Sequence, residues 1–162
     1  MVKQATPIRI LSVEDHPVFR EGLCSIISSQ PDMLLVAQAT NAVEAFAEFR
    51  RHHPDVTLMD LRLPGANGVD ALISIRGEAP QARVIILSTS ETDGEIQRAM
   101  RAGASAYIFK GSYRTDIGFC VCSFGTARWG SLYALADNVR FPLDEFRLPA
   151  RANSPSHQDD RF

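Results

Sequence analysis

Residues 8–17 read IRILSVEDHP, a short apolar run that ends in two acidic residues, a histidine and a proline. The length and apolar character of the run predict a buried β-strand, and the proline is suited to the first turn of a helix. Apolar residues then recur at helical spacing over 19–27. The stretch therefore predicts a strand that carries Glu14 and Asp15 at its carboxyl end and leads directly into a helix.

The same alternation continues along the chain. Segments with helical periodicity separate further apolar runs, which occupy residues 33–39, 56–59, 83–87 and 106–109. Strands that are apolar along their length and are joined through helices indicate a parallel sheet covered on both faces. The expected fold class is α/β, a doubly wound sheet of five parallel strands.

Polar side chains stand at the ends of four of these strands. Glu14 and Asp15 follow the first strand, and Asp60 closes the third. Ser88 follows the fourth strand, and Lys110 follows the fifth. Because ligands of open α/β sheets bind at the carboxyl ends of the strands, we expect these side chains to gather in one crevice.

Three carboxylates in one crevice repel one another, and burying them without a partner is costly. A hard divalent cation relieves that repulsion, and Mg²⁺ prefers oxygen ligands. We therefore expect a Mg²⁺ site formed by Glu14, Asp15 and Asp60, with the backbone carbonyl of Arg62 as a further ligand. His16, beside the acidic pair, is interpreted as a loop residue.

An aspartate beside Mg²⁺ can attack a phosphorus centre and form an acyl phosphate, which makes Asp60 the candidate nucleophile. Lys110 would place a positive charge on one phosphoryl oxygen, and Ser88 would offer a hydroxyl to another. Tyr107 has two interpretations. It is either a packing aromatic with its hydroxyl at the surface, or a ring that changes rotamer when Ser88 moves toward the phosphoryl group.

Composition and charge narrow the function classes. The chain has 162 residues, 45% hydrophobic and 22% charged, and a formal net charge of −2. These values are typical of a globular protein and give no electrostatic footprint for nucleic acid. The stretch SVEDHP also lacks the phosphate loop of a flavin carrier and the Asp-x-Asp of a haloacid-dehalogenase-type phosphatase.

Four motifs together resemble the receiver domain of two-component response regulators, most closely the NarL/FixJ-type subfamily. They are VEDHPVFREGL at 13–23, DVTLMDLRLPGANGVD at 55–70, RVIILSTS at 83–90 and RAGASAYIFKG at 101–111. The resemblance implies a flavodoxin-like (CheY-like) fold with strand order 2-1-3-4-5.

The resemblance also implies roles for single residues. Asp60 would be the phosphoacceptor, and Glu14 and Asp15 the metal-binding pair. Ser88, Tyr107 and Lys110 would be the switch hydroxyl, the aromatic switch and the phosphate-contacting lysine. The implied partner is a sensor histidine kinase, and the implied activity is limited to weak self-dephosphorylation, so no enzyme in the usual sense is expected. Phosphorylation would change the face of the fourth helix and fifth strand, where a homodimer could form.

The resemblance defines three segments: a tail at 1–7, a receiver domain at 8–112 and an atypical segment at 113–162. The last contains no lysine and no recognisable helix-turn-helix, so DNA binding is not expected. A frameshift near Ser112, a genuine short effector tail, and a makeshift fifth helix at 115–122 all remain open. The alternative function is a remnant of a NarL/FixJ-type DNA-binding transcriptional regulator.

Two further expectations concern stability and location. Without a substitute for the fifth helix, apolar surface on the fifth strand and first helix would stay exposed. The polar N-terminus lacks the apolar stretch of a signal peptide, and no run approaches the roughly 20 apolar residues that cross a membrane. A cytoplasmic protein without membrane contact is therefore expected, and the resemblance implies a bacterial one.

Overall fold

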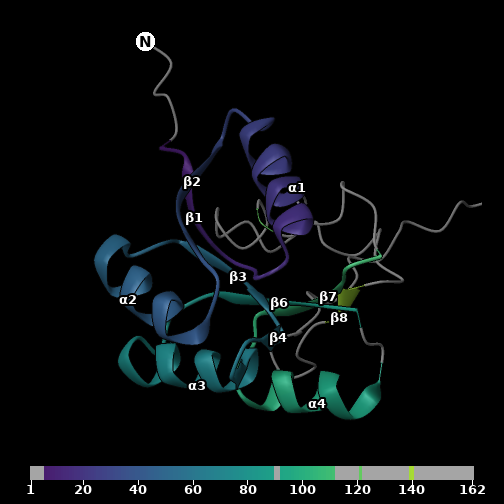
Figure 1. Cartoon of the computed structure of the whole chain (residues 1–162). Coiled ribbons are helices and arrows are strands. Elements are labelled where there is room, and N and C mark those ends of the chain that lie inside the picture. Colours follow the sequence, from purple (N-terminus) through teal and green to yellow (C-terminus); the bar gives the residue numbers. More distant parts are fainter. Residues whose placement is uncertain (1–5, 90–91, 112–120, 122–138, 141–162) are drawn as a thin grey trace, which may run out of the picture.

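The computed structural model describes residues 6–89, 92–111, 121 and 139–140. Five parallel strands form the sheet in the order β2-β1-β3-β6-β7 (Figure 1). In chain order they are β1 (Ile8–Val13), β2 (Met33–Ala39), β3 (Val56–Asp60), β6 (Val84–Ser88) and β7 (Ala106–Phe109). Since β6 and β7 are the fourth and fifth parallel strands, the predicted order 2-1-3-4-5 is confirmed.

Two short strand pairings accompany these five strands, one within the same sheet and one in a separate two-stranded sheet. A strand β8 (Val139–Arg140) pairs antiparallel with β7, so the predicted sheet of five strands is one strand short. The edge of β7 presents backbone groups that another strand can pair with, and a strand of two residues leaves no apolar run in the sequence. A small hairpin, β4 (Arg62–Leu63) with β5 (Ala66–Asn67), follows β3.

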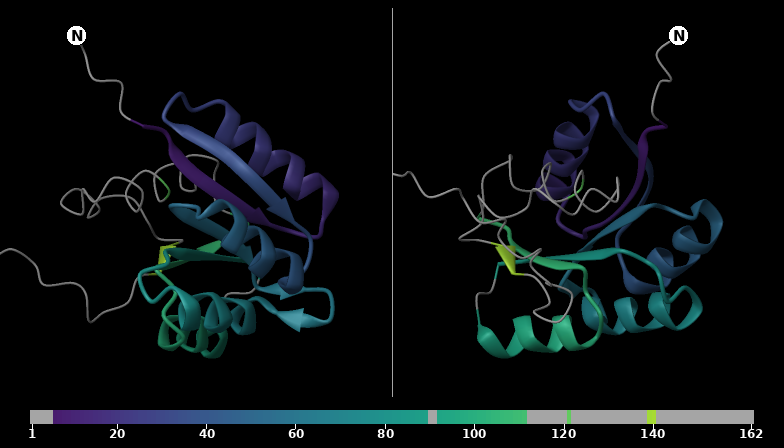
Figure 2. Two further views of the ribbon diagram at one scale, coloured as in Figure 1. Left: turned by 90° about the vertical axis from the view of Figure 1, so that its left-hand side faces the viewer. Right: turned by 180° about the vertical axis from the view of Figure 1, so that it is seen from behind.

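Helices cover the sheet on both faces (Figures 1 and 2). The helix α1 (Pro17–Ser28) lies on one face, and α2 (Ala42–His52), α3 (Gly68–Glu78) and α4 (Asp93–Arg101) lie on the other. Alternate residues of each strand therefore enter two separate cores. In β1, Ile10 packs in the core on the α1 side, whereas Leu11 and Val13 pack in the core on the side of α2 and α3.

Three helix ends lie where proline, asparagine and glycine in the sequence predict them. Pro17 stands at the start of α1, and the Asn41 side chain caps α2 by accepting from the Glu44 backbone N at 2.9 Å. The Glu44 carboxylate in turn accepts from the Thr40 backbone N at 2.8 Å, and this bond lowers the pKa of Glu44. Gly103, with φ +95°, follows α4 in the left-handed conformation that the sequence predicts there.

The expectation of exposed apolar surface is wrong for the fifth strand. Ala106, Tyr107 and Ile108 are all buried, and Val121 is buried within the core on the α1 side. On α1, by contrast, Val18 is 85% exposed. The proposed makeshift helix at 115–122 lies outside the described residues except for Val121, as do the frameshift and effector-tail hypotheses for most of 113–162. None of the described helices is long and apolar enough to cross a bilayer.

Candidate functional site

Strand register brings the predicted site residues to one edge of the sheet. Val13 of β1 is paired with Met59 of β3, so the next residues along each strand, Glu14 and Asp60, lie side by side. Ser88 of β6 is paired with Phe109 of β7, directly before Lys110. The Lys110 backbone N donates to the Ser88 carbonyl at 2.6 Å, which fixes the chain just past the strand.

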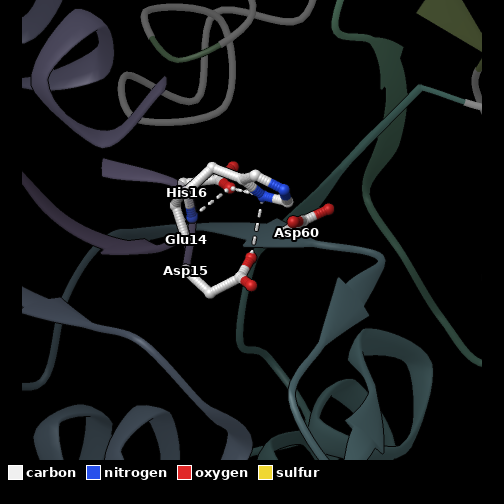
Figure 3. A group of neighbouring side chains, drawn as sticks. All are labelled: Glu14, Asp15, His16 and Asp60. Atoms are coloured by element: carbon white, nitrogen blue, oxygen red, sulfur yellow. Dashed lines mark hydrogen bonds and ion pairs between the residues drawn. The ribbon is translucent and has the colours of Figure 1, made fainter. Parts of the chain in front are cut away.

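Three carboxylates point toward one another at this edge (Figure 3). One ligand atom each of Glu14, Asp15, His16 and Asp60 lies within 4.8 Å of all the others. Glu14 and Asp60 are buried, and Asp15 is half-buried. The buried Asp15 Oδ1 has a single close contact in the described part of the chain, His16 Nδ1 at 3.0 Å, and accepts no other hydrogen bond there, so this carboxylate oxygen has capacity for a further partner.

Lys110 joins the carboxylates from the end of β7. Its Nζ lies 2.6 Å from Glu14 Oε2 and 2.9 Å from Asp60 Oδ2, and the side chain is only 8% exposed. The ammonium also lies over the Phe19 ring of α1, 4.6 Å from the centroid. A single lysine offsets one of the three carboxylate charges, so the cluster keeps an excess of negative charge.

The pKa of Asp60 reflects this balance. Burial is the largest effect and raises the pKa above its ordinary value, and the nearby Glu14 carboxylate raises it further. The hydrogen bond and charge of Lys110 oppose the rise, as does the Arg62 backbone N, which donates to Asp60 Oδ1 at 3.2 Å. The net direction is upward, so the folded chain disfavours the ionised form of Asp60 when no cation is present.

Ser88 and Tyr107 form the neighbouring part of the site. Ser88 is buried at the tip of β6, and the Tyr107 side chain from β7 is 2% exposed. The phenol and the Ser88 hydroxyl are hydrogen-bonded, while burial raises the pKa of Tyr107. The interpretation of Tyr107 as an aromatic with its hydroxyl at the surface is therefore wrong, because the ring fills the core beside the serine.

The comparison with protein families decides the class. The model of the response regulator receiver domain matches residues 10–118, well over half of the chain. This chain belongs to the response regulator receiver family. The response regulator VraR of Staphylococcus aureus is 36% identical over 110 residues, which cover 68% of this chain and 53% of VraR. The receiver chain thus spans about half the length of the curated relatives it matches.

Solved structures agree with the family and with the resemblance to NarL. The signal receiver domain of NarL from Mycobacterium tuberculosis superposes with a TM-score of 0.73 at 29% identity, covering 76% of this chain and 100% of that one. A LuxR-family response regulator from Aurantimonas superposes with a TM-score of 0.72 at 34% identity, covering 75% and 87%. The CheY-like fold and the NarL/LuxR-type neighbours are therefore established.

The acidic pocket of the receiver fits a magnesium ion. Its donors are carboxylate oxygens, which suit a hard cation, and the excess negative charge would be neutralised by one. Glu14, Asp15 and Asp60 are the residues that would hold the ion. The Arg62 carbonyl remains a predicted further ligand, since its residue lies two positions after Asp60 at the start of the β4–β5 hairpin.

Two residues of the site were missed by sequence reasoning. His16 lies in the loop before α1, as predicted, but its Nδ1 also lies 3.0 Å from Asp15 Oδ1 and 3.2 Å from Glu14 Oε1, contacts that the sequence did not predict. Arg20, one turn later, donates to the backbone carbonyls of Glu14 and Asp15 at 3.1 and 3.3 Å. Helical spacing from the acidic pair to Arg20 was the available signal, because it places the guanidinium back over the start of the helix.

Proposed function

We propose that this receiver is a phosphoacceptor switch of a two-component phosphorelay, in which Asp60 takes the phosphoryl group. The observation that carries the proposal is the position of Asp60. Its carboxylate is buried beside Glu14 and Asp15, and the Lys110 ammonium lies 2.9 Å from Oδ2. A nucleophile, an excess of acidic ligands and a fixed cation are the parts that phosphoryl transfer needs.

The proposed donor is a phosphohistidine of a sensor histidine kinase. An Asp60 carboxylate oxygen forms a bond to phosphorus as the bond between phosphorus and the imidazole nitrogen breaks, and the electron pair leaves with the imidazole. Lys110 would hold one phosphoryl oxygen, and the Ser88 hydroxyl would hold another. A bound Mg²⁺ would neutralise charge on the phosphoryl oxygens. Water then hydrolyses the acyl phosphate slowly, so the receiver is not an enzyme in the usual sense.

The output of the switch is proposed to lie at α4 and β7. Tyr107 lies in β7 and contacts Ser88 through its hydroxyl. Movement of the serine toward a phosphoryl group would therefore open space beside the tyrosine ring. A change at this face would alter contacts with a partner or with a second copy of the chain. We also propose that the receiver acts in the cytoplasm. The alternative function is that of a remnant of a DNA-binding NarL/FixJ-type regulator.

Incubation of the full chain with Mg²⁺ and acetyl phosphate, followed by intact-mass measurement, tests the proposal. The wild type should gain one phosphoryl group, and the gain should be lost in Asp60→Asn and when the cation is chelated. Asp70→Asn is the matched control, since Asp70 is an exposed aspartate on α3 outside the pocket. A phosphoryl gain that persists in Asp60→Asn, or none in the folded wild type, would refute the proposal.

A further inference from the structure

The helix α4 is lightly held in the fold. Among its residues only Ala99 is buried, and Ile96 and Met100 are partly buried against the core. Two ion pairs with exposed partners tie it to its neighbours. One joins Arg98 to Asp70 of α3 at 3.2 Å, and the other joins Glu95 to Arg62 at 3.9 Å. With so little apolar burial, polar contacts have a large share in setting the position of α4.

Glu95 connects the start of α4 to the loop after the phosphoacceptor. Its Oε2 accepts from the Thr92 hydroxyl at 3.0 Å, and the Glu95 backbone N donates to the Thr92 carbonyl at 3.1 Å. Its Oε1 faces the Arg62 guanidinium. One carboxylate therefore both closes the first turn of α4 and pairs with an arginine from another element.

Arg62 is tied to Asp60 at its other end. The Arg62 backbone N donates to Asp60 Oδ1 at 3.2 Å, so the residue that carries the guanidinium is bonded directly to the phosphoacceptor. The charges of Glu95 and Arg62 also act on the Tyr107 phenol in opposite directions, which places the pair next to the ring as well. The arginine side chain is 69% exposed and is therefore free to change partners.

We infer that the Arg62–Glu95 pair is a charge-sensitive latch that holds the first turn of α4 while Asp60 is unphosphorylated. The inference rests on the proposed function and adds its regulation. A phosphoryl group increases the negative charge beside Arg62, and a guanidinium binds phosphoryl oxygens at least as well as it binds a carboxylate. The phosphoryl group therefore competes with Glu95 for Arg62, and its success releases the start of α4.

Because of thermodynamic linkage, the latch can also be tested by weakening the ion pair and measuring the effect on the phosphoryl site. If phosphorylation weakens the pair, then weakening the pair must favour the phosphorylated form by the same factor. Glu95→Gln removes the charge but keeps an oxygen that can accept from Thr92, so the helix start is preserved. An exposed ion pair of this kind corresponds to about a two- to fivefold change in affinity.

The experiment measures the affinity of the full chain for beryllofluoride, a phosphoryl mimic, by calorimetry in the presence of Mg²⁺. Glu95→Gln should bind about two- to fivefold more tightly than the wild type. Asp70→Asn is the matched control: it breaks the other ion pair of α4, which does not reach Arg62, and should leave the affinity unchanged. In an Arg62→Gln background, which keeps the backbone of the loop, Glu95→Gln should have no effect.

Two results would overturn the latch while leaving the proposed function intact. One is an affinity of Glu95→Gln equal to that of Asp70→Asn. The other is the same gain in the Arg62→Gln background, because the effect would then not pass through the arginine. A wild type that neither binds beryllofluoride nor takes a phosphoryl group from acetyl phosphate would instead refute the proposed function, and the latch with it.

Discussion

The helices α3 and α4 flank the same site but are held in different ways. Five residues of α3 are buried, and its first residue, Gly68, donates to the Leu61 carbonyl at 2.8 Å. In α4 only Ala99 is buried, and exposed ion pairs join it to Arg62 and α3. The comparison teaches that the acidic pocket is built on the packed part of the molecule, whereas the element proposed to respond is lightly held.

The ion pairs of the acidic pocket and of α4 also differ in their burial. The Lys110 contacts with Glu14 and Asp60 are buried, so losing one partner leaves an uncompensated charge in the interior. The Arg62–Glu95 pair is largely exposed, so solvent compensates for its loss. Loss of the Lys110 ammonium should therefore change stability far more than loss of an exposed charge on α4.

The largest effect is expected for Lys110→Met. Without the ammonium, the buried carboxylates of Glu14 and Asp60 lose their cationic partner, and the free energy of unfolding should fall by about 3–5 kcal/mol. Urea unfolding in the absence of Mg²⁺ measures this loss, and added Mg²⁺ should recover part of it. Arg98→Met, which breaks an exposed pair on α4, is the control and should cost less than about 1 kcal/mol. Equal losses of stability in the two variants would contradict the expected difference between the buried and the exposed ion pairs.

A smaller but still large effect is expected for Gly68→Ala. A Cβ at this position would lie 2.1 Å from the Asp60 carbonyl oxygen, so α3 or the end of β3 must move. Overpacking of this kind costs about 1–3 kcal/mol, and phosphoryl uptake should fall as well because Asp60 is displaced. Gly77→Ala, in the same helix with nothing within 4 Å, should instead stabilise by about 0.5–1 kcal/mol. Thermal unfolding of both variants measures these changes. A Gly68→Ala variant as stable as the wild type would contradict the prediction.

The smallest effect concerns Asp60→Asn and pH. Because folding raises the pKa of Asp60, the ionised carboxylate lowers stability at neutral pH. The stability linked to this group is fully present below its unfolded pKa, near 3.8, and is lost as pH rises through the higher folded pKa. Without a divalent cation, Asp60→Asn should therefore melt at a higher temperature than the wild type at pH 7. The difference should shrink toward pH 4, and a variant that melts lower at pH 7 would contradict the account.

The fold was predictable because each strand is a continuous apolar run and each strand end is polar. The five parallel strands followed from that pattern, and so did the meeting of Glu14, Asp15 and Asp60. The order of the strands followed from the resemblance to receiver domains. The strand β8 was not predictable, since a two-residue pairing to an edge strand depends on tertiary proximity alone.

The contacts that surround the pocket were harder to predict. The burial of Tyr107 depends on how α4 packs over β7, and strand periodicity does not show which side of a ring reaches solvent. The His16 contacts depend on how α1 starts, and the Arg62–Glu95 pair joins β4 to the first turn of α4, 33 positions apart in the sequence. Local patterns carry no information about such long-range polar contacts.

Hydrogen exchange of the full chain, with Mg²⁺ alone and with Mg²⁺ plus beryllofluoride, tests most directly whether the pocket acts on α4. The account predicts faster amide exchange in the first turn of α4, residues 93–96, when beryllofluoride is added. Exchange in α3 should stay the same, because its buried face and its contact with Leu61 do not change. Equal changes in the two helices, or no change at α4 while Asp60 takes a phosphoryl group, would contradict it.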